Sequence, residues 1–266
     1  MTLLAIILGT LAAGIGSVWL AAMLSFGAMA RYTQHMLSLA AGALLSTAFM
    51  HILPEAFESG VEPHDLFLVL LGGLVFFFLL DKAELWHHGH EHHHAEGDAI
   101  AHGHGHDHGH AHGAAGSGSW AVLAGDSVHC FGDGILIASA FMADLKLGVI
   151  AALSVLAHEV PHHVGDLSVL RSAANTRRAA LVKVSLAGAV TTLGGLLGFW
   201  MLAQLQDFQV YFLVLASSSF IYVALADLIP QLQKRLSLRA TAVQVAWLLT
   251  GILMVVAVGR LFHAAH

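Results

Sequence analysis

The sequence has few of the residues that hold a soluble or secreted domain together. Only 11% of its 266 residues are charged, whereas 57% are apolar. This balance excludes a disordered chain and argues against an ordinary soluble domain. Cysteine occurs once, at Cys130, so no intramolecular disulfide can form. Acidic residues outnumber basic ones, and the net charge of −6 argues against a nucleic-acid partner.

Long apolar runs are what the chain has in abundance. The first run lacks the basic start of a signal peptide and is too long for one, so we interpret it as a membrane span. A membrane-spanning helix needs roughly 20 apolar residues. Eight runs qualify, at about residues 2–26, 36–57, 65–86, 120–143, 147–170, 180–202, 209–232 and 241–262. We therefore predict an all-α integral membrane protein with eight transmembrane helices, forming a single transmembrane domain over residues 1–266.

The distribution of Lys and Arg predicts the orientation of these helices. If the N-terminus lies outside, nine of the 11 basic residues lie in or beside inner connections, and only Lys146 and Arg260 lie at the outer side. Basic residues are enriched on the cytoplasmic side of membrane proteins. We therefore expect both termini outside. The lack of a bulky ectodomain and of targeting signals favours a bacterial-type inner membrane.

A histidine-rich tract at residues 87–113 separates the third and fourth predicted helices. Twelve of the 21 histidines lie within it. A tract of this composition cannot pack a core, so we expect a mobile cytoplasmic loop. Its imidazoles are weak, exchangeable ligands for Zn²⁺, Ni²⁺ or Cu²⁺. The alternative is a bare solvated linker.

The fourth and fifth predicted helices carry ionisable residues on one face each. On the fourth, Asp126, His129 and Asp133 fall within about 60° of one another. On the fifth, a second set falls within about 100°: His158, Glu159, His162 and Asp166. Imidazole and carboxylate bind divalent transition metals, and ionisable groups inside a membrane are costly and usually functional. The two helices are therefore predicted to form a metal site.

Five further residues are candidates for a metal pathway. Glu55, near the end of the second helix, is either an interfacial group or part of metal entry, and Asp227 of the seventh helix is either an interfacial cap or a pathway residue. The candidates are His51, Glu55, Asp126, His163 and Asp227.

The motifs of the fourth and fifth helices resemble those of a known family. The patterns H-x-x-x-D-G and H-E-x-P-H-x-x-G-D are similar to those of the ZIP (Zrt/Irt-like) metal transporters, especially the branch with H-E-x-P-H and a histidine-rich loop. The resemblance implies a ZIP-like bundle that imports Zn²⁺ into the cytoplasm, with Cd²⁺, Fe²⁺ and Mn²⁺ as further substrates and no organic cofactor. Divalent metal ions, the lipid bilayer and a second copy of the chain are the expected partners.

The resemblance also implies roles for individual residues. The principal ligands would be His129, Asp133, His158 and His162, and a neighbouring second position would involve Cys130 and Glu159. Cys130 stands where the family commonly has Asn, and His163 where this branch usually has Glu. These departures, with the absence of Asp and Glu from residues 167–206, leave the first position intact and put the second in question.

Other classes of protein share single features with this chain. H-E-x-x-H over residues 158–162 is also the zinc-protease motif, which would indicate an intramembrane metalloprotease. The D-G pair precedes that motif here, and Pro161 lies inside it, both of which count against the protease. A cation-diffusion exporter would need six spans and a cytoplasmic C-terminal domain. A membrane metal sensor or store is a third alternative.

Overall fold

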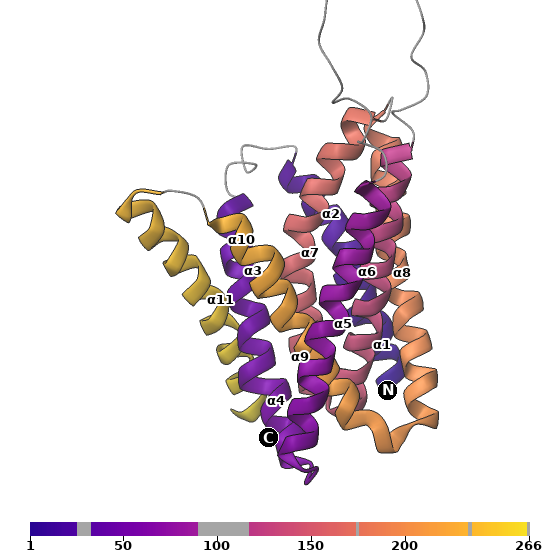
Figure 1. The fold of residues 1–266 in the computed structure, drawn as a ribbon, viewed down its shortest axis with the longest axis vertical. Coiled ribbons are helices and arrows are strands. Elements are labelled where there is room, and N and C mark those ends of the chain that lie inside the picture. Colours follow the sequence, from indigo (N-terminus) through magenta and orange to yellow (C-terminus); the bar gives the residue numbers. More distant parts are fainter. Residues whose placement is uncertain (26–32, 90–116, 174–175, 234–235, 265–266) are drawn as a thin grey trace, which may run out of the picture.

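The chain folds into a bundle of long helices, shown here by a computed structural model (Figure 1). The structure describes residues 1–25, 33–89, 117–173, 176–233 and 236–264, and no strand occurs among them. Five long helices are unbroken: α5 (Pro63–Gly89), α6 (Ser117–Ala143), α7 (Leu145–Ala173), α8 (Arg177–Gln204) and α11 (Leu238–Ala264). The predicted helices are thus present, with ends shifted by a few residues.

The other three long helical segments each contain a π-helical turn. The first consists of α1 (Thr2–Leu11), η1 (Ala12–Gly16) and α2 (Ser17–Ser25). The second consists of α3 (Thr33–Thr47), η3 (Ala48–Ile52) and α4 (Leu53–Glu58). The third begins with the short η4 (Gln206–Phe208) and continues through α9 (Gln209–Tyr222), η5 (Val223–Leu228) and α10 (Ile229–Leu232).

Two of these π-helical turns lie just before a proline. Pro54 follows η3 and Pro230 follows η5 by two residues. Proline has no N–H to donate, and its ring clashes with the carbonyl four residues earlier in an α-helix. A wider π-helical turn before the proline removes this clash while the helix continues.

Seven segments of the described chain are long and apolar enough to cross a membrane: Thr2–Leu24, Thr33–Glu58, Pro63–Leu80, Leu145–Leu167, Arg178–Gln204, Gln206–Leu232 and Leu238–Leu261. The chain is therefore an integral, multi-pass membrane protein. α6 is not one of these seven segments because its polar residues lower its hydropathy. It nevertheless has 27 residues and packs against α7 and α8. The count of eight spans, the outer termini and the type of membrane stay predictions.

The first and the last described helix have their chain termini on the same side of the bundle. In Figure 1 the start of α1 and the end of α11 lie at the lower end, whereas the end of α5 and the start of α6 lie at the upper end. α6, α7 and α8 pack with the first helical segment, α3 packs on α11, and α5 packs on α9. Residues 87–89 belong to α5, and the rest of the predicted histidine-rich loop lies outside the described residues.

Glycines allow the closest helix contacts. A Cβ added to Gly134 of α6 would overlap the carbonyl oxygen of Thr191 in α8, and one added to Gly194 of α8 would overlap that of Phe131 in α6. Small residues let helices approach closely where no aqueous hydrophobic effect drives their association. The α6–α8 contact therefore fixes the backbone of α6 beside Asp133.

Candidate metal centre

Four side chains from two helices meet in what we call the first group: His129 and Asp133 of α6 with His158 and Glu159 of α7. One ligand atom from each residue lies within 4.8 Å of the others. Nε2 of His158 lies 3.2 Å from Asp133 Oδ2 and 3.2 Å from Glu159 Oε1. Nε2 of His129 lies 3.3 Å from Glu159 Oε1 and 3.3 Å from His158 Nε2. Two imidazoles and two carboxylates are a ligand set suited to Zn²⁺.

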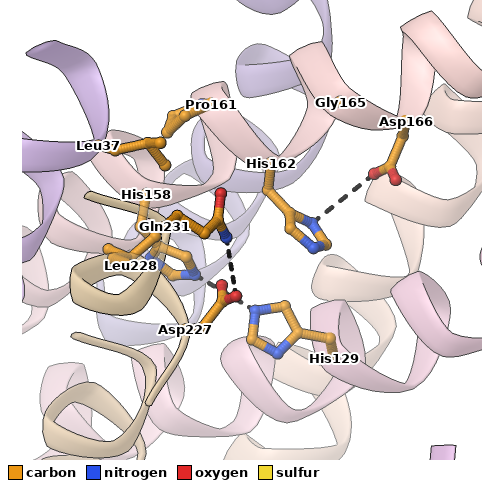
Figure 2. Close-up of a pocket in the computed structure, with 10 residues that line it drawn as sticks. All are labelled: Leu37, His129, His158, Pro161, His162, Gly165, Asp166, Asp227, Leu228 and Gln231. Atoms are coloured by element: carbon orange, nitrogen blue, oxygen red, sulfur yellow. Dashed lines mark hydrogen bonds and ion pairs between the residues drawn. The ribbon is translucent and has the colours of Figure 1, made fainter. Parts of the chain in front are cut away.

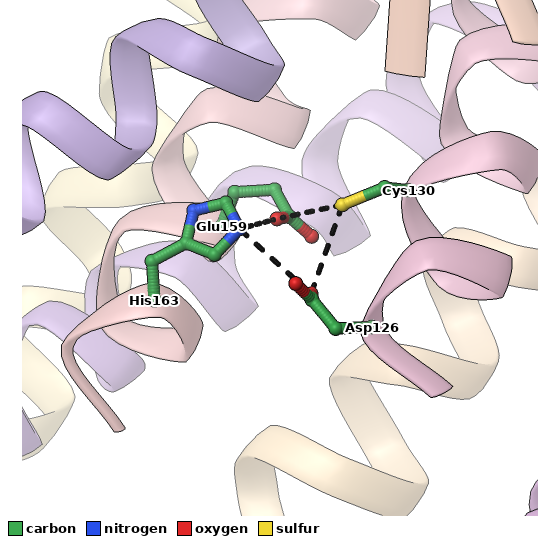
Figure 3. A group of neighbouring side chains, drawn as sticks. All are labelled: Asp126, Cys130, Glu159 and His163. Carbon is green, nitrogen blue, oxygen red and sulfur yellow. Dashed lines mark hydrogen bonds and ion pairs between the residues drawn. The ribbon is translucent and has the colours of Figure 1, made fainter. Parts of the chain in front are cut away.

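A second group lies beside the first and contains the single cysteine. Asp126, Cys130, Glu159 and His163 are all buried, and their side chains point toward one another (Figure 3). The Cys130 Sγ lies 3.7 Å from Asp126 Oδ1 and 3.7 Å from Glu159 Oε2. Nε2 of His163 lies 3.1 Å from Glu159 Oε2 and 3.8 Å from Asp126 Oδ1. This set combines a soft sulfur ligand with nitrogen and oxygen.

A third group consists of Asp126, His162 and Asp166. Its His162 and Asp166, together with His129 and His158 of the first group, line a cavity of about 360 Å³. Nδ1 of His162 lies 3.6 Å from Asp126 Oδ1 and 3.7 Å from Asp166 Oδ2. Figure 2 shows Asp227 and Gln231 on the same cavity, where the Gln231 amide donates a 2.8 Å hydrogen bond to Asp227 Oδ1. The His162 side chain is 38% exposed, so this group is the most open of the three.

Helix periodicity explains how two helices supply three groups. Residues four apart lie above one another on a helix. His129 and Asp133 therefore share one stripe of α6, and Asp126 and Cys130 share the next. On α7, Glu159 and His163 form one such pair and His162 and Asp166 another. Two carboxylates serve two groups each: Glu159 belongs to the first and second, and Asp126 to the second and third.

Some polar atoms of these groups are buried without a hydrogen bond. Six of them make no hydrogen bond with any described residue: Asp126 Oδ2, Asp133 Oδ2, Glu159 Oε1, His162 Nδ1, His163 Nε2 and Asp166 Oδ2. A buried polar atom without a hydrogen bond costs about 1–3 kcal/mol, so a cluster of six needs another partner. A bound cation would satisfy these lone pairs.

A backbone carbonyl of α7, that of Ser154, fixes the orientation of the His158 imidazole. Nδ1 of His158 lies 3.3 Å from the carbonyl oxygen of Ser154, and a carbonyl can only accept a hydrogen bond. Nδ1 therefore carries a proton, and in the neutral imidazole Nε2 then presents its lone pair to the first group. The Ser154 hydroxyl is itself hydrogen-bonded to Thr47 of α3 at 2.5 Å.

The grouping of the ligands in the structure differs in one respect from the set predicted from the sequence. Of the predicted principal set, His129, Asp133 and His158 lie together, with Glu159 as their fourth member. His162 lies instead in the third group, although its ring centroid is only 5.6 Å from that of His129. The roles of these residues as ligands stay predictions.

The candidate pathway residues are divided between two regions. Asp126 and His163 lie in the groups, and Asp227 lines the cavity. His51 packs against Gly259 of α11, and Glu55 is exposed on α4 at the lower end in Figure 1.

Sequence reasoning missed Gln231 and Ser17. Gln231 lies four residues after Asp227, which is a usable signal because such residues share a helix face. Ser17 is 146 residues from its partner His163 and has no such signal.

Comparison with known proteins agrees with this geometry. A family model described as ZIP Zinc transporter matches residues 1–259. The chain is 34% identical to zinc transporter ZIP10 of Mus musculus over 152 residues, which is 57% of this chain and 18% of that protein. It is 35% identical to zinc transporter ZIP4 of Homo sapiens over 115 residues, 43% of this chain and 18% of that protein.

A further relative is matched over more of its length. Zinc transporter ZIP13 of Pongo abelii is 27% identical over 252 residues, which is 85% of this chain and 69% of that protein. The matches to ZIP10 and ZIP4 thus span less than a fifth of those longer proteins, whereas the family match extends over nearly the whole chain. The chain therefore belongs to the ZIP zinc transporter family, whose members are zinc transporters and not enzymes.

Proposed function

We propose that the chain imports a divalent transition metal, zinc first, into the cytoplasm through the groups between α6 and α7. The observation that carries this proposal is the set of buried imidazole and carboxylate atoms without hydrogen bonds, supplied by two neighbouring helices of a membrane bundle. Ionisable groups at such positions mark ion pathways. The relatives' names support zinc as the substrate.

The shared carboxylates give the proposal a path. An ion in the first group would already be bound by Glu159, which also belongs to the second group. Asp126 connects the second and third groups in the same way. The cavity with Asp227 is lined by residues of both the first and the third group. An ion can therefore move from one group to the next without losing all its ligands at once. Asp166 would pass the ion on rather than select it.

The distribution of charge supports an orientation of the bundle in the membrane. Nine basic residues against two favour both termini outside, which makes the upper end in Figure 1 the cytoplasmic one. The cavity beside the first and third groups would then be on the route to the cytoplasm. The histidine-rich tract at residues 87–113 would capture or sense metal on that side.

Zinc flux into proteoliposomes tests the function. Purified protein is reconstituted around an entrapped zinc indicator, and initial uptake is compared with that of protein-free liposomes. His158→Ala should abolish most of the uptake because it removes a ligand whose orientation Ser154 fixes. Asp144→Asn is the matched control, since Asp144 caps the start of the same helix with hydrogen bonds to backbone N–H groups and lies outside the three groups. Normal uptake by His158→Ala at equal reconstitution would contradict the proposal.

Orientation needs a separate measurement. A tag on either terminus should be accessible from outside intact cells, and a label within residues 97–113 only after permeabilisation. Termini on opposite faces would exclude eight spans.

A further inference from the structure

A buried hydroxyl from the first helical segment contacts the second group from outside. Oγ of Ser17, the first residue of α2, lies 2.9 Å from Nδ1 of His163, and both residues are fully buried. The other ring nitrogen of His163, Nε2, faces Glu159 and Asp126. The His163 ring thus lies between the Ser17 hydroxyl on one side and the two carboxylates of the second group on the other.

The protons of this contact can be assigned by counting donors. A serine hydroxyl has one proton to donate. Ser17 donates it to the carbonyl oxygen of Gly14, at 2.5 Å. Its oxygen must then accept the hydrogen bond from His163, so the proton of the neutral imidazole lies on Nδ1 and Nε2 has a free lone pair.

A second observation agrees with this assignment. Nε2 of His163 lies only 3.1 Å from Glu159 Oε2, yet it makes no hydrogen bond with any residue in the described part of the chain. An unprotonated nitrogen cannot donate to a carboxylate. Both atoms present lone pairs to the same space, which is the arrangement that a metal ion requires.

The position of Ser17 is fixed by a helix crossing. Gly14 lies in the π-helical turn η1, and a Cβ added to it would overlap the carbonyl oxygen of Gly188 in α8. This close approach holds the Gly14 carbonyl, and the hydroxyl that bonds it, in one place. π-Helical turns inside α-helices often occur at functional sites.

We propose that Ser17 is a positioning residue for the second group: by giving its own proton to Gly14, it holds His163 in the tautomer whose Nε2 binds metal. This inference rests on the proposed metal transport and extends it to a residue of the first helical segment. Partners of a metal-binding imidazole set its tautomer and its orientation.

Cys130 provides a direct test because it is the only cysteine in the chain. A thiolate bound to Cd²⁺ gives an ultraviolet charge-transfer band, so in this protein the band reports occupancy of the second group alone. Purified full-length protein in detergent is titrated with Cd²⁺. The parent should show the band, and Ser17→Ala should need roughly 10–100 times more Cd²⁺ for half its amplitude. Ser17→Thr, which keeps the hydroxyl, should restore the parent titration.

Ser139→Ala is the matched control. Ser139 is also buried, and it also donates to a carbonyl three residues earlier, that of Leu136, at 2.7 Å; it belongs to none of the three groups. Ser139→Ala should titrate like the parent. Equal titrations for Ser17→Ala and Ser139→Ala would overturn the proposal, and so would a parent without the band. Zinc uptake by the parent, measured in parallel, tests the proposed function separately.

A second measurement does not depend on how the serine variants fold. Nitrogen-15 NMR of histidine-labelled, Cd²⁺-loaded protein, with His163→Gln for assignment, distinguishes the two ring nitrogens. The expected result is a protonated Nδ1 and a metal-bound Nε2. The reverse pattern would overturn the proposal.

Discussion

Gly134→Ala, which adds one methyl group at a helix contact, should displace residues of the candidate metal centre although Gly134 is not one of them. The new Cβ would overlap the carbonyl oxygen of Thr191 in α8. A backbone atom cannot rotate away as a side chain can, so α6 and α8 must separate. A Cβ added to Gly132, two residues earlier on α6, would meet no atom of the described residues within 4 Å, which makes Gly132→Ala the matched control.

The expected difference between the two variants can be estimated. Replacing Gly by Ala inside a helix gains about 1 kcal/mol in either case. Only Gly134→Ala adds the strain of overpacking, about 1–3 kcal/mol. The propensity gain cancels in the comparison, so Gly134→Ala should be less stable than Gly132→Ala by about 1–3 kcal/mol. At roughly 2–4 °C per kcal/mol for a chain of this size, its melting temperature should be lower by roughly 2–12 °C.

The assay is thermal unfolding in detergent, followed by loss of the monodisperse size-exclusion peak. Zinc uptake is measured on the same preparations. Gly134→Ala should need a higher zinc concentration for half-maximal uptake, because a shift of the backbone at residue 134 also moves Asp133. Gly132→Ala should match or exceed the parent in stability. Indistinguishable melting temperatures for the two variants would refute the reasoning that this glycine is required by the helix contact.

Three further predictions concern the groups and the loop. Glu159→Ala should reduce zinc uptake more than either Asp133→Ala or Cys130→Ala, since it removes a ligand from two groups; equal losses for all three in the proteoliposome assay would contradict its shared role. Cys130→Asn with His163→Glu should raise Mn²⁺ uptake relative to Cd²⁺ uptake, because sulfur prefers softer metals; an unchanged ratio in competitive uptake would exclude a selective second position. Deleting residues 90–113 should leave substantial uptake, since a polar tract of this composition is not expected to line a membrane path; complete loss in a stably expressed deletion would show that the tract conducts metal.

Local patterns in the sequence predict much of this structure. The apolar runs predict helix ends within a few residues, with 209–232 expected and Gln209–Leu232 found. The i, i+4 spacing of His129 and Asp133 places them on one face of α6. Small residues in a membrane helix favour close approach to a neighbour, and Gly194 of α8 approaches Phe131 in this way.

Long-range packing decides what the sequence could not predict. The π-helical turn η1 has no proline nearby, and it lies where Gly14 crosses Gly188, a contact between residues far apart in the chain. Ideal α-helical angles place Cys130 about 100° from His129, which separates it from the first group but cannot show that Asp126 and His163 complete its surroundings. The grouping of His162 with Asp166 and Asp126 depends on how α7 is rotated against α6, which no single-helix argument contains.

The sharing of Glu159 between two groups has an electrostatic consequence. Two divalent cations in adjacent groups repel each other and also compete for the same carboxylate charge. Under the proposed transport, the arrival of one ion would therefore weaken the binding of the ion in the neighbouring group. Conduction requires sites that bind firmly enough to admit an ion and loosely enough to release it. A carboxylate common to neighbouring groups would reconcile these demands, because a lone ion would be held tightly and would be displaced when the next one enters.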